Sequence, residues 1–123
     1  MNLFGLWIAT AATMIACTKA APETTPEQAA EKYFGALAAG DCPGIQAWSG
    51  GELAAKIAKE GCPTAFEEAK SHGLVFVSAT GARPDGRDAN ARLVDIAIKT
   101  DGKDKKVIGR IEKVGDGWKV VTL

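Results

Sequence analysis

Apolar residues recur at helical spacing near the start of the chain, between residues 25 and 42. Five of them fall on one helical face at intervals of three and four: Ala30, Tyr33, Phe34, Leu37 and Ala38. Thr25 is a good N-cap, and Gln28 three residues later completes a capping box. Pro26 suits the first helical position, and Gly40 suits a left-handed C-terminal residue. The pattern predicts a helix that begins after Thr25 and ends at Gly40.

Three shorter helical segments follow, each with only a few apolar residues. They are predicted over Gly44–Ser49, Glu52–Glu60 and Ala65–Ser71. Thr64 is expected to cap the last of these, with Glu67 completing a second capping box. Because such short helices are marginal alone, they must pack on another element.

The hydrophobic period changes from helical to alternating after residue 73. Four strands are predicted, over Leu74–Thr80, Ala91–Thr100, Lys105–Val114 and Trp118–Leu123. Gly81–Asp88 is rich in turn-forming residues and is predicted to be a loop. Asp101 and Gly102 both tolerate positive φ and predict a tight hairpin.

Alternation within the second strand places Val94, Ile96 and Ile98 on one face of the sheet. Strands joined mostly by tight turns form an antiparallel meander. Because the helices precede all of the strands, the predicted class is α+β, with N-terminal helices packed on a curved antiparallel sheet of about four strands.

The first sixteen residues have the features of an export signal. Leu3–Ala16 is apolar and uncharged, but it is shorter than the roughly 20 residues of a membrane-spanning helix. It ends in Met14-Ile15-Ala16-Cys17, which resembles the lipobox of bacterial lipoproteins. The resemblance implies a signal peptide over residues 1–16 and acylation of Cys17, followed by a flexible tether to residue 24. An ordinary secretory leader and a retained anchor helix are the alternatives.

Acylation would attach the protein to a membrane through Cys17, because several acyl chains anchor a protein firmly. Thr18, rather than an aspartate, follows the cysteine. By analogy with bacterial lipoproteins, the expected location is the cell envelope, at the outer membrane and facing the periplasm.

Charge and composition narrow the classes of function. The chain has 15 basic and 15 acidic residues. This balance argues against binding to nucleic acid, which requires a strongly positive surface. Residues 25–123 are long enough for one domain. The sequence indicates no cofactor.

Cys42 and Cys62 are predicted to form a disulfide bond. Each precedes a proline, and an exported protein lies in an oxidising compartment. Two free thiols or a metal-binding pair are the alternatives. A zinc site would lack ligands, because the chain has no CxxC motif and a single histidine, His72.

Two segments resemble the nuclear-transport-factor-2-like (cone) superfamily. The first helix and its end, Tyr33-Phe34-Gly35-Ala36-Leu37-Ala38-Ala39-Gly40-Asp41, match an aromatic–x–x-Ala-Leu–x–x-Gly-Asp pattern. Gly117-Trp118-Lys119-Val120 resembles the superfamily's closing strand. The resemblance implies helices on a curved sheet with a concave face that can bind ligands. Residues 25–123 are therefore expected to form an NTF2-like domain.

The resemblance also implies a place for Tyr33, which matches the tyrosine of the steroid isomerases. That chemistry needs a carboxylate base and a protonated acid as well. The region where the base is expected reads Ser49-Gly50-Gly51-Glu52 and contains no aspartate. Tyr33 is therefore interpreted as a core aromatic whose hydroxyl is hydrogen-bonded near the cavity mouth, and the protein as a non-catalytic one.

The candidate pocket lies on the concave sheet face that the resemblance implies. Its candidate lining residues are Tyr33, Leu37, Trp48, Phe76, Ile96 and Trp118. The expected occupant is a small apolar ligand or a protein partner. The alternatives are an isomerase- or cyclase-like enzyme that uses Tyr33, and an immunity- or assembly-type interaction lipoprotein. His72 and the acidic and basic residues between 83 and 92 are expected at the surface.

Overall fold

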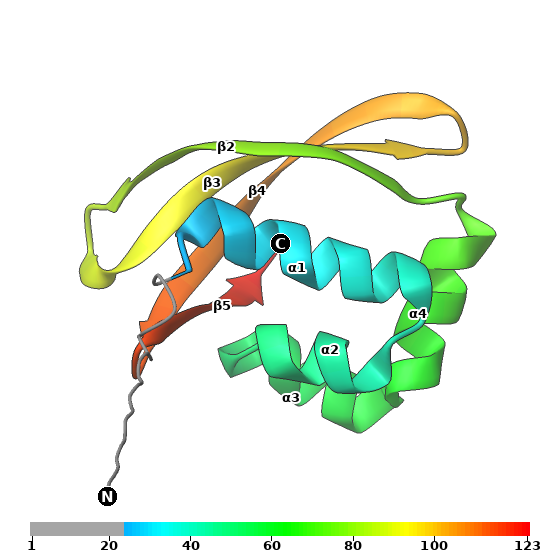
Figure 1. Cartoon of the computed structure of the whole chain (residues 1–123), viewed down its shortest axis with the longest axis horizontal. Coiled ribbons are helices and arrows are strands. Elements are labelled where there is room, and N and C mark those ends of the chain that lie inside the picture. The colour runs from blue at the N-terminus through cyan, green and yellow to red at the C-terminus, as the bar shows by residue number, and fades with distance from the viewer. Residues whose placement is uncertain (1–23) are drawn as a thin grey trace, which may run out of the picture.

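The described part of the chain folds into four helices packed on one face of a four-stranded antiparallel sheet. The computed structural model describes residues 24–123. The helices are α1 (Pro26–Ala39), α2 (Cys42–Trp48), α3 (Gly51–Glu60) and α4 (Cys62–Ser71). The strands are β2 (Val75–Asp85), β3 (Asp88–Thr100), β4 (Lys103–Val114) and β5 (Gly117–Thr122), and they neighbour one another in chain order. The predicted α+β class and antiparallel meander are confirmed (Figure 1).

Helix α1 lies across the concave side of the curved sheet (Figure 1). Its predicted ends are confirmed, because Thr25 and Gln28 form the reciprocal capping box and Gly40 ends the helix at φ 69°. Four of the five predicted apolar residues are buried, but Ala38 is exposed. Ala29 and Ala36 are buried as well, since the sheet and α2 pack on neighbouring faces of the helix.

The core lies between α1 and the inner face of the sheet. Val94, Ile96 and Ile98 of β3 are all buried, as the alternation predicts. Ile111 of β4 and Val120 of β5 are fully buried beside them. An aromatic pair adds to this core at the edge of the sheet, where Phe34 of α1 stacks on Phe76 of β2 with ring centroids 5.9 Å apart.

The predicted loop over Gly81–Asp88 is wrong, because β2 continues to Asp85 and turns through Gly86 and Arg87. Glycine and proline are tolerated here because β2 is an edge strand, where irregular pairing costs little. The register with β3 shifts between Thr80 and Arg83, where Gly81 adopts φ 70°. The predicted hairpin at Asp101-Gly102 is confirmed, with positive φ at both residues.

The predicted capping box at Thr64 and Glu67 is also wrong. Helix α4 begins three residues earlier than predicted, at Cys62, and Gly61 precedes it with φ 91°. Pro63 lies in the first turn, where its missing N–H does no harm. The Thr64 hydroxyl instead donates to the carbonyl of Glu60, which links the end of α3 to the start of α4.

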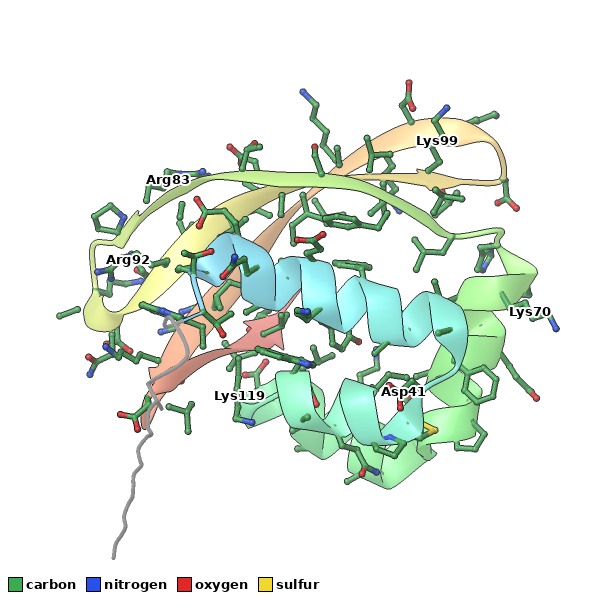
Figure 2. The ribbon with its side chains drawn as sticks, viewed as in Figure 1. Asp41, Lys70, Arg83, Arg92, Lys99 and Lys119 are labelled. Carbon is green, nitrogen blue, oxygen red and sulfur yellow. A yellow bond between two sulfur atoms is a disulfide. The ribbon has the colours of Figure 1, made fainter. Side chains whose placement is uncertain are left out.

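The predicted disulfide bond is present and joins Cys42 to Cys62, whose Cα atoms are 5.8 Å apart. These are the first residues of α2 and α4, so the bond closes a segment that contains α2 and α3. Its sulfur atoms lie near Asp41, the N-cap of α2 (Figure 2). Within the same segment, the carbonyl of Ala47 in α2 accepts a hydrogen bond from Nζ of Lys119 in β5, at 2.6 Å.

Candidate functional site

A cavity of about 880 Å³ lies between three helices and one end of the sheet. Helices α1, α3 and α4 form much of its wall, and β5 and the β3–β4 turn complete it. Its apolar lining includes Leu37, Leu53, Ile57, Leu74, Val121 and Leu123. The volume falls within the range of small-molecule sites, which are mostly apolar with a few polar groups.

Tyr33 of α1 lines this cavity and has an unpartnered polar group. The residue is only 3% exposed, and its ring packs edge-on against Phe34 with centroids 5.4 Å apart. The hydrogen bond expected for its hydroxyl is not found, because no group within residues 24–123 bonds to it. Burial raises the pKa of the Tyr33 hydroxyl to about 12, because the phenolate would lose its hydration. Tyr33 therefore stays protonated at neutral pH and can donate a hydrogen bond.

Charged side chains surround the apolar lining. Glu52, Lys56 and Glu60 come from α3, and Glu68 comes from α4. Asp101 and Lys105 come from the β3–β4 turn and the start of β4. All six of these residues are exposed. The polar boundary can therefore interact with water and with the outer end of a ligand.

His72 also lines the cavity, at the point where α4 meets the β3–β4 turn. Its Nδ1 is 3.5 Å from Oδ2 of Asp101, and its carbonyl accepts a hydrogen bond from the Asp101 N–H at 2.6 Å. It is the C-cap residue of α4, and its side chain is exposed as expected. This pair joins the helical layer to the sheet at one end of the cavity.

Among residues 24–123, the cavity lining does not include the buried acid and base that isomerase chemistry needs. Each carboxylate that lines the cavity is exposed to water, so none is in the apolar environment that would hold it protonated at neutral pH. Tyr33 can supply a hydrogen bond, but no buried acid or base from residues 24–123 lines the cavity beside it. The site offers a largely apolar hollow that is open to solvent, together with one hydroxyl donor.

The structure brings two of the six predicted pocket residues, Tyr33 and Leu37, into this cavity. The other four are placed in and around the core. Ile96 is fully buried, Phe76 stacks on Phe34, and Trp48 packs against the core from α2. Trp118 packs against the core as well, and the guanidinium of Arg92 lies 5.5 Å from its ring centroid.

Sequence reasoning missed the contribution of α3 to the site. Glu52, Lys56 and Glu60 recur at intervals of four, beside the apolar pair Leu53 and Ile57. On a helix this spacing places three charges along one edge of an apolar stripe. That pattern was the available signal for a helix that borders a cavity.

A second polar group is more buried than the sequence indicated. Asp85, expected at a solvated hairpin, is 6% exposed. Its carboxylate accepts a hydrogen bond from Nε of Arg110 at 2.9 Å, and Arg110 also contacts Asp88 and Glu112. These bonds satisfy the hydrogen-bonding capacity of the Asp85 carboxylate, so the cluster has a structural role. It lies apart from the cavity.

Two further features of the described residues bear on function. No helix over residues 24–123 is long and apolar enough to cross a membrane. That same part of the chain contains no group of three or more histidine, cysteine, aspartate or glutamate residues that could hold a metal ion. The predicted lipidation site Cys17 and the predicted signal peptide lie outside the described residues.

Comparison with protein-family models, curated proteins and solved structures finds no match to this chain.

Proposed function

We propose that this chain is a lipid-anchored protein of the bacterial cell envelope whose NTF2-like domain binds a small apolar ligand. The observation that carries the proposal is Tyr33, a buried residue that lines a mostly apolar cavity and whose hydroxyl has no hydrogen-bond partner in residues 24–123. A buried hydroxyl without a partner costs free energy. A ligand with a hydrogen-bond acceptor would remove that cost.

The NTF2-like assignment rests on the order of elements and on two short motifs. Helices precede a curved antiparallel sheet, and α1 lies on the concave side (Figure 1). The resembling segments fall in α1 and its end, and in β5. The site differs from the concave-face pocket that the resemblance implied, because it lies between the helices and one end of the sheet.

The membrane anchor and the location in the envelope rest on the lipobox-like Met14-Ile15-Ala16-Cys17. The disulfide bond supports export, since such bonds form and persist in oxidising compartments. Labelled palmitate is expected to enter the wild-type protein and not Cys17→Ala. Equal labelling of both proteins would refute acylation of Cys17, and a Cys17→Ala protein that is still exported would separate anchoring from secretion.

Native mass spectrometry of residues 18–123, exported without the lipid and purified gently, tests the binding function. The expected result is an additional mass that remains under native conditions and disappears on denaturation. The same preparation of Tyr33→Phe should retain less of this mass, because the hydrogen bond to the ligand is lost. Equal retention by both proteins would remove Tyr33 from the binding site.

A second function, interaction with another envelope protein, is favoured by the outer face of the sheet. The helices leave this face bare (Figure 1). Val75 of β2 and Ile108 of β4 are 53% and 55% exposed, and they pair with Lys99 and Asp95 on the outer side of β3. Exposed apolar side chains on an uncovered sheet face are available to a protein partner. Pull-down from envelope extracts with Ile108→Lys as the control would test this function.

A further inference from the structure

The charges that border the cavity are not balanced. Among residues 24–123, four carboxylates line it, from Glu52, Glu60, Glu68 and Asp101, against two ammonium groups, from Lys56 and Lys105. With His72 counted as neutral, two net negative charges remain. The chain as a whole has equal numbers of acidic and basic residues, so the excess is a local property of this site.

The four carboxylates come from three separate elements. Glu52 and Glu60 lie two helical turns apart on α3, Glu68 is on α4, and Asp101 is in the β3–β4 turn. They therefore border the cavity from several sides rather than forming one acidic run along a helix. Since all four are exposed, their field acts at the polar boundary and not at the apolar lining.

Tyr33 supplies an independent indication of a ligand. Its hydroxyl belongs to a residue that is 97% buried, lines the same cavity and finds no partner in residues 24–123. A protonated phenol beside apolar side chains favours an acceptor such as a carbonyl, an ether or a hydroxyl. The site thus combines a buried lining residue that has an unpartnered donor with a negative field at the exposed boundary.

From these two features we infer that the ligand is a cationic amphiphile, with an apolar body, a hydrogen-bond acceptor at its buried end and a positive charge at its outer end. This inference rests on the proposed binding function and names the class of molecule that the site selects. An anionic amphiphile of the same shape is disfavoured, because its outer end would face the excess of carboxylates.

The test uses three probes that share one chain length and one methyl ester, and differ in their other end. They are the methyl ester of ω-aminododecanoic acid, the monomethyl ester of dodecanedioic acid and the dimethyl ester of dodecanedioic acid. Calorimetric titration of the protein at neutral pH and low salt should give tightest binding for the amino ester. We expect it to bind roughly tenfold more tightly than the acid ester, and added salt should narrow the difference.

Two triple variants with the same change in net charge test whether the carboxylates that border the cavity cause the preference for the amino ester. The triple variant Glu52→Gln, Glu60→Gln, Glu68→Gln removes three carboxylates that border the cavity. The control variant Glu31→Gln, Glu67→Gln, Asp116→Asn makes the same change in net charge at exposed residues outside the lining. The first should abolish the preference for the amino ester, and the control should keep it.

The outcomes separate this inference from the proposed function. Binding of the acid ester as tightly as the amino ester, or an equal loss of preference in both triple variants, would overturn the cationic ligand and leave apolar binding in place. Failure of all three probes to bind, the neutral diester included, would overturn the proposed binding function together with the inference.

Discussion

Nε of Arg110 in β4 lies 2.9 Å from Oδ2 of Asp85, the last residue of β2. β3 separates the two strands in the sheet, so the bond spans a neighbouring strand at the β2–β3 hairpin. The Asp85 carboxylate also accepts a hydrogen bond from the Arg87 N–H within the turn. This single buried carboxylate therefore holds the hairpin turn and fastens it to the third strand of the sheet.

The Asp85 cluster should make stability depend on pH in the acidic range. The hydrogen bond from Arg110 is the main reason that the pKa of Asp85 is lowered, with the Arg87 N–H adding to it. A lowered pKa in the folded state contributes stability above the unfolded-state pKa, and that stability is lost as pH falls through the folded-state pKa. The urea midpoint of the wild type should therefore fall on acidification more steeply than that of Asp85→Asn.

Asp104→Asn is the matched control for this comparison, because Asp104 is an exposed aspartate at the other end of the sheet. Its acid dependence should follow the wild type. Indistinguishable acid profiles for the wild type and Asp85→Asn would mean that the Asp85–Arg110 pair contributes nothing to stability in this range.

Removal of the disulfide bond should destabilise the helical layer. The bond closes a segment whose ends are 20 residues apart in sequence, for which chain-entropy models give about 3 kcal/mol. The double variant Cys42→Ala, Cys62→Ala should lose a similar free energy of unfolding in urea. Reduction of the wild type should produce the same loss, and should leave the double variant unchanged. A reductant effect of equal size on both proteins would show that the loss does not come from this bond.

Much of the fold could be predicted from local signals in the chain. The Thr25–Gln28 capping box and Gly40 set the ends of α1, and alternation placed Val94, Ile96 and Ile98 in the core. These features depend on neighbouring residues alone. The extension of β2 through Gly81 and Pro84 could not be predicted in this way, because it depends on pairing with β3 and on the position of β2 at the sheet edge.

The site was harder to predict than the fold, since a cavity is set by where elements end in space. Tyr33 was singled out from its helix, and it does line the cavity. Glu68, His72 and Asp101 come together there only because α4 and the β3–β4 turn meet, which spacing along the chain does not reveal. Asp85 was expected to be solvated for the same reason, because its partner Arg110 is 25 residues away.

Substitution of Tyr33 by phenylalanine should stabilise the unliganded protein. The change removes a buried hydroxyl without a partner in residues 24–123 and keeps the ring that packs against Phe34. Leaving such a group unsatisfied costs about 1–3 kcal/mol, so an increase of about 1 kcal/mol in the free energy of unfolding is expected. Ligand binding should weaken in the same variant, and this opposite effect distinguishes a binding residue from a purely structural one. A loss of stability in Tyr33→Phe would mean that the hydroxyl has a partner in the free protein.

Tyr33 is the only tyrosine in the chain, so the ultraviolet absorption of tyrosinate reports its ionisation alone. Burial raises the pKa of the folded protein's Tyr33 from 10.0 to about 12. A pKa raised in the folded state contributes stability that is fully present below pH 10 and is lost as pH rises towards 12, because the unfolded chain releases the proton first. Absorbance titration should therefore give a midpoint near 12 in the folded protein and near 10 in urea, and the unfolding free energy of Tyr33→Phe should lack this alkaline decline.

A ligand that accepts the hydrogen bond from neutral Tyr33 should move the folded midpoint higher still. A folded midpoint near 10 would place the hydroxyl in water and remove the basis for its role in the cavity.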